Sequence, residues 1–217
     1  MQTGVVMNEP LKTGTTTLGI TYRTGVVLGT ESRATMGSFI AHKKTQKLFK
    51  IDNNIGLTMA GLVGDAQLLA RYLQAEVAIY KLKRGVPISI KAASTLMANI
   101  LASRSYYPYW VQLLIAGIDD EGAHVYSLDP AGGCIEDDYV STGSGSPFVY
   151  GVLEDYFKKD MDEKNAIELA VRAISSAKKR DSASGNAIQL AVINSKEFKY
   201  FTEDEIDKLV QKVGGEE

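Results

Sequence analysis

The order in which two kinds of hydrophobic pattern follow one another constrains the fold of this chain most. Runs rich in β-branched and apolar residues predict strands at residues 15–22, 26–31, 47–51, 55–60, 109–119, 123–128, 134–139 and 187–194. Apolar stripes at three- and four-residue steps predict helices at about residues 65–84, 89–104, 147–158, 162–180 and 202–213. Strands followed by paired helices, twice over, indicate a layered α+β domain.

Two antiparallel sheets packed face to face, with helices on both outer sides, would bury all of these apolar stripes. We therefore expect a four-layer αββα sandwich. The chain has 217 residues, 45% of them hydrophobic, which suffices for one sizeable domain, and no internal repeat is visible. At the first long helix, Asp65 is expected to cap the beginning and Gly85 to mark the end.

Composition argues against several classes of function. Lys and Arg number 24 against 26 Asp and Glu, and a formal charge of −2 does not favour a nucleic-acid partner. No apolar run approaches the roughly 18 to 20 residues that a membrane span needs. The single cysteine, Cys134, is expected to be a small buried residue, and it leaves no internal disulfide. These observations predict a reducing, cytoplasmic setting.

Histidine-based and metal-based chemistry find little support. The two histidines, His42 and His124, have no neighbours at metal-ligand spacing, so neither a metal site nor a cofactor is expected. No Gly-x-Ser-x-Gly elbow is present. The run Gly143-Ser144-Gly145 resembles part of a phosphate-binding loop but lacks the Lys and the Ser or Thr that should follow.

Residues 1–14 show neither helical nor strand periodicity, and they lack the basic start of a signal peptide. They end at Gly14, directly before a strand that begins with three threonines. If the bond between Gly14 and Thr15 were cut, Thr15 would carry a free amine able to activate its own hydroxyl. Taken alone, however, such a motif is more often a loop that enters a strand.

Six motifs occur together and in a fixed order. They are residues 14–19, 30–35, 47–49, 60–66, 143–147 with 150–151, and 180–185. In this combination the chain resembles the archaeal-type β subunits of the 20S proteasome, members of the N-terminal-nucleophile hydrolases, over nearly all of residues 14–195. The resemblance implies a threonine endopeptidase that degrades unfolded proteins to peptides inside the core particle.

The resemblance also implies roles for individual residues. Thr15 would be the nucleophile and, once freed, supply the base through its amine. Lys47 would lie beside the threonine hydroxyl, Glu31 would pair with that lysine, and Gly61 would form the oxyanion hole. The side chains implied to orient the threonine amine and its water are Ser144, Asp181 and Ser184.

The implied substrate site lies next to these residues. Its S1 pocket would be lined by Ala34, Thr45, Met59 and Val63, and Thr35 would pair with the substrate backbone. Such a pocket predicts cleavage after hydrophobic residues, with the peptide bound as an added strand.

The resemblance divides the chain into a propeptide, residues 1–14, removed by self-cleavage between Gly14 and Thr15, and a single catalytic domain, residues 15–217. It implies seven-membered β rings stacked in pairs, capping rings of α subunits, and an ATP-dependent unfoldase that acts through the α ring. One alternative is a non-catalytic ring subunit of the same fold, although Thr15, Glu31, Lys47 and Asp181 are all present. Another is a different N-terminal-nucleophile hydrolase, such as the peptidase of the bacterial two-component protease or a small-molecule amidase.

Overall fold

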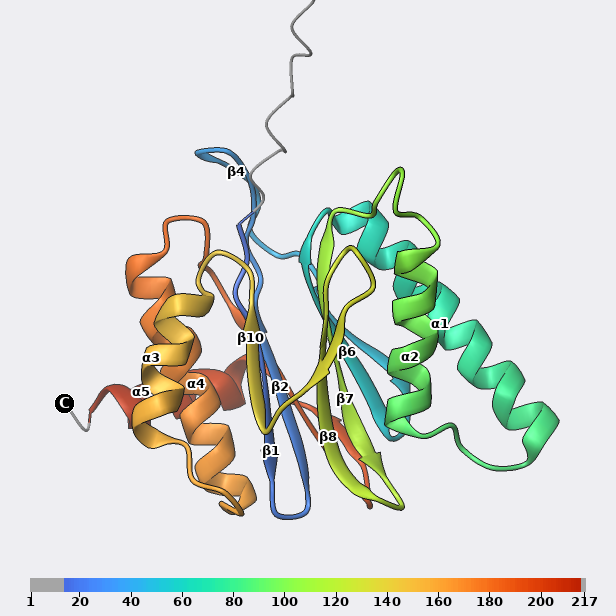
Figure 1. Cartoon of the computed structure of the whole chain (residues 1–217). Helices are drawn as coiled ribbons and strands as arrows, with labels where there is room; N and C mark the ends of the chain where they lie inside the picture. Colours follow the sequence, from blue (N-terminus) through green and yellow to red (C-terminus); the bar gives the residue numbers. More distant parts are fainter. Residues whose placement is uncertain (1–13, 216–217) are drawn as a thin grey trace, which may run out of the picture.

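A computed structural model describes residues 14–215, in which two five-stranded antiparallel sheets pack face to face between two layers of helices (Figure 1). The first sheet, in spatial order, consists of β10 (Tyr139–Thr142), β1 (Thr17–Tyr22), β2 (Gly25–Glu31), β11 (Ile188–Asn194) and β12 (Phe198–Tyr200). The second consists of β5 (Leu48–Asp52), β6 (Ile55–Gly61), β7 (Val111–Asp119), β8 (Gly122–Leu128) and β9 (Cys134–Glu136). The expected four-layer αββα sandwich is confirmed.

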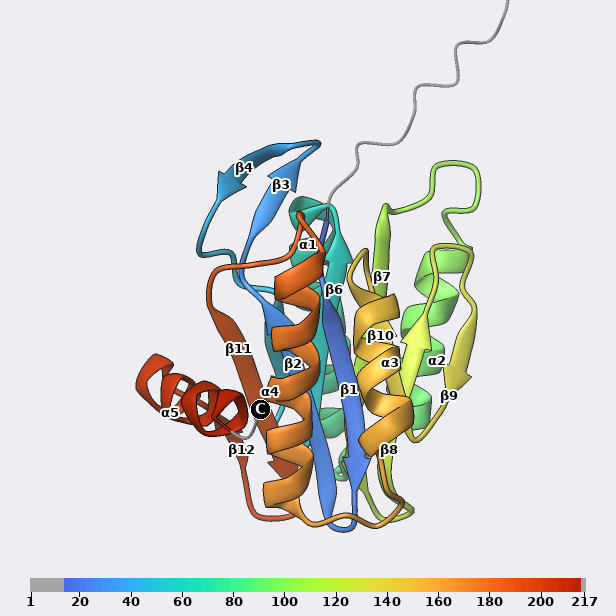
Figure 2. The same cartoon turned by 90° about the vertical axis from the view of Figure 1, so that its left-hand side faces the viewer.

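Five helices form the outer layers of the described chain. The second sheet is covered by α1 (Val63–Arg84) and α2 (Ile90–Ala102), and the first by α3 (Ser146–Tyr156), α4 (Glu163–Arg180) and α5 (Glu203–Gly214) (Figures 1 and 2). Their positions agree with the five stripes in the sequence to within a few residues at each end.

Three apolar clusters fill the three spaces between these layers. One lies between α1, α2 and the second sheet and includes Leu69, Leu73 and Leu113. Another lies between the first sheet and its helices, and a third joins the two sheets through residues such as Leu28 and Leu114. Because the strands in the middle of each sheet are covered on both faces, strands such as β2 are buried along their whole length.

Local signals explain several helix ends. The Asp162 side chain accepts a hydrogen bond from the Asn165 amide (2.8 Å) at the beginning of α4, and Thr202 forms a capping box at the beginning of α5. Gly85 ends α1 in the left-handed conformation at φ 72°, as expected. The expectation for Asp65 was wrong: Leu62 is the N-cap residue, and the Asp65 carboxylate instead accepts from the Trp110 amide at 3.1 Å.

Besides the short edge strand β12, which was not predicted, two other features differ from the sequence prediction. The single strand expected at residues 134–139 is two strands: β9 belongs to the second sheet and β10 to the first, because the chain crosses between the sheets at residues 137–138. The short hairpin of β3 (Ala34–Met36) and β4 (Phe39–His42) was not predicted. It stands out from one end of the sandwich, and Phe39 is 68% exposed there (Figure 2).

The remaining expectations concern particular side chains and the membrane. Cys134 is partly buried against the core of the second sheet, and burial raises the pKa of its thiol. His124 lies on β8, and its Nδ1 is 2.5 Å from Oε1 of Glu136.

Within residues 14–215, no helix combines the length and the hydropathy needed to cross a bilayer. In the same part of the chain, no group of three or more His, Cys, Asp or Glu side chains is arranged to hold a metal ion.

Candidate active site

A cluster of buried polar side chains lies at the end of the sandwich where β1 begins. The β3–β4 hairpin stands at the same end (Figure 2). Thr15 comes just before β1, Glu31 is the last residue of β2, and Lys47 comes just before β5 of the other sheet. All three are almost completely buried, with exposures of 1%, 0% and 1%. Charged side chains are rarely buried to this extent unless they are paired.

Lys47 is the centre of this cluster. Its ammonium Nζ donates a hydrogen bond to the Thr15 hydroxyl oxygen at 3.0 Å, and it also donates to Glu31 Oε1 and to the main-chain carbonyl of Arg33. Burial lowers the pKa of Lys47 below its usual value, and the neighbouring Glu31 carboxylate partly opposes that shift. A cation in contact with the Thr15 oxygen favours the alkoxide that a nucleophile must become.

The Glu31 carboxylate is fixed from several sides. Its Oε2 accepts from the main-chain amides of Arg33 (2.7 Å) and Gly185 (3.0 Å), and its Oε1 accepts from the Thr16 amide at 3.4 Å. These three hydrogen bonds restrict the rotation of the Glu31 carboxylate. The fixed carboxylate in turn holds the Lys47 ammonium beside the Thr15 hydroxyl.

A second group of side chains surrounds the Thr15 nitrogen. The Thr15 main-chain amide donates to Ser144 Oγ at 3.2 Å, and Ser144 Oγ donates to Asp181 Oδ2 at 2.6 Å. Ser184 Oγ donates to the same carboxylate oxygen at 2.6 Å and lies 2.6 Å from the Thr16 hydroxyl. Asp181 is therefore linked to Thr15 through Ser144 and to Thr16 through Ser184.

Two glycines permit the close approach of main-chain segments at this end. Gly143 has φ +89°, and a Cβ on it would lie 2.1 Å from the Thr15 carbonyl oxygen and 3.2 Å from the Ala60 side chain. Gly61 has φ +118°, and a Cβ on it would lie 2.1 Å from the Trp110 carbonyl oxygen. Both positions require a residue without a side chain.

The residues expected to bind substrate lie around this cluster but differ in accessibility. Thr35, on β3, accepts a hydrogen bond from the Gly14 amide through its hydroxyl oxygen at 3.0 Å. Ala34 and Val63 are partly buried, and Thr45 is 9% exposed. Met59 is fully buried and packs in the same core cluster as Val63, so in this structure its side chain does not reach an open surface.

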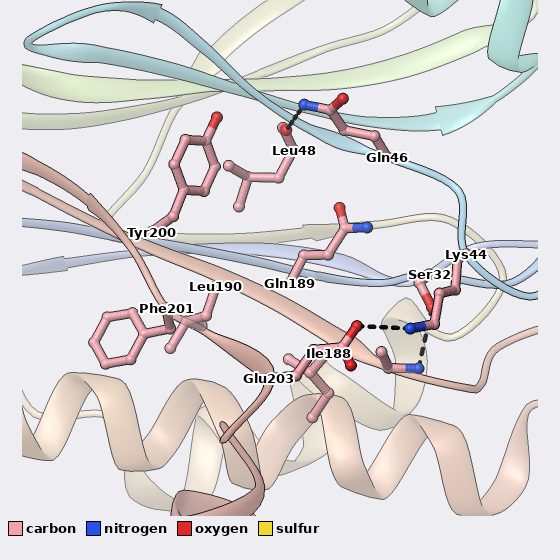
Figure 3. A pocket seen from close by; sticks show the side chains of 11 residues that line it. Ser32, Lys44, Gln46, Leu48, Ile188, Gln189, Leu190, Tyr200, Phe201 and Glu203 are labelled. Atoms are coloured by element: carbon pink, nitrogen blue, oxygen red, sulfur yellow. Dashed lines mark hydrogen bonds and ion pairs between the residues drawn. The ribbon is translucent and has the colours of Figure 1, made fainter. Parts of the chain in front are cut away.

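A small cavity lies next to the cluster, along β11 and the segment that leads into β5. Its volume is about 240 Å³, and its lining includes Ser32, Gln189 and Leu48 (Figure 3). Gln189 Oε1 accepts from the Lys47 amide at 3.0 Å, and its amide nitrogen donates to the Thr45 carbonyl at 2.8 Å. Gln189 thus fixes the main chain at Lys47, a contact that no pattern in the sequence indicates.

The Arg33 side chain is a second contact that sequence reasoning missed. It reaches across to the loop after α4, where its Nε donates to Asn186 Oδ1 at 3.0 Å. Arg33 occurs within the motif at residues 30–35, but its position there carries no information about a partner 153 residues away.

The arrangement as a whole is suited to acyl transfer. A buried hydroxyl lies beside a cation, the nitrogen of the same residue is hydrogen-bonded toward a carboxylate, and glycines let main-chain segments pack closely around them. A nucleophile and an orienting acid are parts that such chemistry requires.

Comparison with known proteins agrees with this geometry. A family model described as proteasome subunit matches residues 11–193. The chain is 54% identical over 206 residues to a protein named proteasome subunit beta from Picrophilus torridus, covering 94% of this chain and 98% of that protein. It is 52% identical over 209 residues to the proteasome subunit beta of Thermoplasma acidophilum, covering 96% and 99%, and 52% identical over 201 residues to that of Methanothermobacter thermautotrophicus, covering 92% and 96%.

Proposed function

Because this chain belongs to the proteasome subunit family, as a β subunit and a threonine-type peptidase of the 20S core particle, we propose that Thr15 is its nucleophile and that Thr15 removes residues 1–14. One observation carries this proposal: the Thr15 hydroxyl oxygen lies 3.0 Å from the buried ammonium of Lys47 and 2.6 Å from the carbonyl oxygen of Gly14. The hydroxyl therefore lies against the bond that it would cut.

Leader removal would proceed by an acyl shift. The Thr15 oxygen attacks the Gly14 carbonyl carbon, the bond from that carbon to the Thr15 nitrogen breaks, and the nitrogen takes up the hydroxyl proton. Water then hydrolyses the resulting ester, which releases Gly14 as a carboxylate and leaves Thr15 with a free amine. The bond from the Gly14 amide to the Thr35 hydroxyl oxygen supports this geometry, because it holds the main chain of Gly14 beside β3.

Peptide cleavage would use the same oxygen and the new amine. An α-amine has a reference pKa of about 7.7–8.0, so near neutral pH it can accept the Thr15 hydroxyl proton. Lys47, paired with Glu31, would stabilise the alkoxide, and Ser144, Ser184 and Asp181 would orient the amine. The main-chain amide of Gly61 would stabilise the oxyanion, a contribution worth roughly 10²–10³ in rate.

The preference for substrates is proposed from the surrounding side chains. Thr35 on β3 would pair with an extended substrate backbone, as its hydroxyl does with Gly14. Ala34, Thr45, Met59 and Val63 would form the S1 pocket and favour cleavage after hydrophobic residues. Because Met59 is buried here, substrate entry would require its flexible side chain to change rotamer.

As a β subunit, the chain assembles into the proteasome together with α subunits. We further propose that it forms seven-membered rings stacked in pairs, that an ATP-dependent unfoldase delivers unfolded polypeptides through the α rings, and that the particle works in the cytoplasm. Mass measurement of the intact particle, co-expressed with its α partner, tests the stoichiometry directly.

The central experiment compares Thr15→Ala with the wild type in co-expressed particles. We expect the wild type to begin at Thr15 and to hydrolyse peptides, while Thr15→Ala keeps residues 1–14 and loses hydrolysis altogether. Intact mass and a fluorogenic peptide assay measure these outcomes. Thr24→Ala, a change in the exposed turn between β1 and β2, is the matched control and should behave like the wild type.

Two outcomes would contradict the proposal. A Thr15→Ala chain that still loses its leader would show that another group performs the cut. A wild-type chain that keeps its leader in assembled, inactive particles would instead favour a non-catalytic ring subunit.

A further inference from the structure

We propose that Arg33 and Asn186 form a clamp that holds the loop at residues 181–186 against the catalytic threonine, which makes both of them positioning residues for the peptidase reaction. This inference rests on the proposed function, because it concerns the same site. Neither side chain touches the reacting atoms, so their effect would pass through Asp181 and Ser184.

The Arg33 guanidinium makes two bonds to the loop. Its Nε donates to Asn186 Oδ1 at 3.0 Å, and one terminal nitrogen donates to the Ser182 carbonyl at 2.9 Å. The planar fork of an arginine can serve two acceptors in fixed directions, which a lysine cannot do. The two acceptors stand at opposite ends of residues 182–186, so a single side chain spans the loop that carries Ser184.

Gly185, between those acceptors, lies directly against the guanidinium. A Cβ at position 185 would be 2.3 Å from Arg33 Cζ, so the arginine and the loop main chain are in close contact. This contact also brings the Gly185 amide to Glu31 Oε2, where it donates at 3.0 Å. The clamp therefore supports the Glu31 carboxylate as well as the loop.

The main chain of Arg33 contacts the other half of the site. Its amide donates to Glu31 Oε2 at 2.7 Å, and its carbonyl accepts from the Lys47 ammonium. One residue thus joins the ion pair that acts on the Thr15 oxygen to the loop that acts on the Thr15 nitrogen. A shift of about 1 Å between such groups can cost about 10²-fold in rate.

The backbone of Asn186 is compatible with this constraint. It adopts φ +64°, a left-handed conformation that is uncommon for residues other than glycine, although asparagine enters it more often than most. Such conformations persist where surrounding contacts hold them, and they gather at functional sites. The contact that the Asn186 side chain makes is the bond from Arg33, through its Oδ1.

The pairing of β2 with β11 next to the loop does not depend on the clamp. The Ser32 amide donates to the Ala187 carbonyl at 2.9 Å, and the Ala187 amide donates to Ser32 Oγ at 3.0 Å. These bonds fasten the beginning of β11 to the end of β2. Removing the clamp should therefore loosen the loop and leave the strands in place.

The experiment measures kcat and KM for a fluorogenic peptide in fully assembled particles that carry one of four variants. Arg33→Met removes the donor, and Asn186→Gly removes the acceptor but permits the positive φ. Asn186→Asp keeps an acceptor at the same place, and Arg33→Met combined with Asn186→Gly tests coupling. Lys81→Met, which breaks an exposed ion pair with Asp52, is the control.

We expect Arg33→Met and Asn186→Gly each to lower kcat by about 10- to 100-fold while KM changes less than about twofold. The double variant should be no slower than the slower single variant, because Arg33→Met already removes the only bond that Asn186→Gly is designed to break. Asn186→Asp should retain most of the wild-type kcat, and Lys81→Met all of it. A general loss of stability would not produce this coupling or this rescue.

A kcat near that of the wild type in both single variants would overturn the inference, as would multiplicative losses in the double variant. If Arg33→Met does not assemble, Asn186→Gly and Asn186→Asp decide the question alone. A wild-type particle without hydrolysis that depends on Thr15 would instead overturn the proposed function, so the two failures can be told apart.

Discussion

Two lysine–glutamate pairs, whose lysines are only three residues apart in the chain, differ in almost every physical respect. Lys47 and Glu31 have side chains only 1% and 0% exposed, whereas Lys44 and Glu203, with N and O atoms 2.9 Å apart, are 75% and 68% exposed. The first pair lies at the junction of the two sheets. The second joins the loop before β5 to the beginning of α5, at the rim of the cavity (Figure 3).

The comparison teaches what burial does to a charge. Water and salt screen the exposed pair, so its contribution to the free energy of unfolding is small. Lys47 has lost its water, which lowers the pKa of its ammonium and makes every remaining contact stronger. A buried charge of this kind is a common mark of a functional site, and here it lies 3.0 Å from the Thr15 hydroxyl oxygen.

The largest expected effect comes from breaking the buried pair. Lys47→Met should reduce peptide hydrolysis by at least about 10²–10³-fold, because the Thr15 oxygen loses the cation that favours its ionised form. It should also lower the free energy of unfolding by about 3–5 kcal/mol, because Glu31 stays buried without its partner. Peptide assays and urea unfolding of the chain measure the two effects.

Retention of the leader gives a second measure of the same variant. If Lys47 acts only on stability, Lys47→Met particles that assemble will still begin at Thr15, and intact mass will detect this. Such a result would contradict a catalytic role for Lys47 in leader removal. The predicted loss in the free energy of unfolding would not be affected by it.

An intermediate effect is expected in the pH dependence of activity. Lys47 acts as a cation, so hydrolysis should fall as pH rises through its pKa. Because burial lowers that pKa, the fall should begin below the ordinary lysine value of 10.5. Glu31→Gln removes the carboxylate that raises the pKa of Lys47, so this variant should lose activity at lower pH than the wild type.

Profiles of kcat/KM against pH, recorded for both particles, check this prediction. Gln at position 31 has nearly the size of Glu and retains one oxygen that can accept from the Arg33 and Gly185 amides, while the charge is removed. A basic limb that shifts to higher pH in Glu31→Gln would contradict the assignment of the cation to Lys47.

The smallest effect is expected at the exposed pair. Lys44→Met should change the free energy of unfolding by less than about 1 kcal/mol, and it should leave peptide hydrolysis unchanged. Urea unfolding and the peptide assay again measure both. If Lys44→Met were as damaging as Lys47→Met, proximity to the site rather than burial would account for the difference between the pairs.

Much of the fold could be predicted because it depends on local pattern. The stripe through Leu69, Leu73 and Val77 predicts α1, and Gly85 predicts its end. The assignment of residues 134–139 to one strand failed because alternation reports that a segment is extended, not which sheet it joins. The β3–β4 hairpin was missed because Met36 and Phe39 are exposed there, so no buried face imposes a pattern.

The site could be predicted only through resemblance to a family. Thr15, Lys47 and Asp181 are far apart in sequence, and no periodicity connects them. The structure brings these three together with Glu31, Ser144 and Ser184, while their catalytic roles remain predictions. The supporting contacts of Arg33 and Gln189 were not predicted, because a hydrogen bond across 142 or more residues leaves no local signal.

The position of the cluster between two sheets has a consequence for timing. Thr15 lies just before β1 of one sheet and Lys47 just before β5 of the other, so we expect them to meet only when the apolar layer between the sheets has formed. A chain with one sheet in place would have a nucleophile without its cation. Under the proposed mechanism, then, the active form of the protease is produced only after the chain has folded. The cut after Gly14 is a covalent change, so a chain that begins at Thr15 is one that has folded.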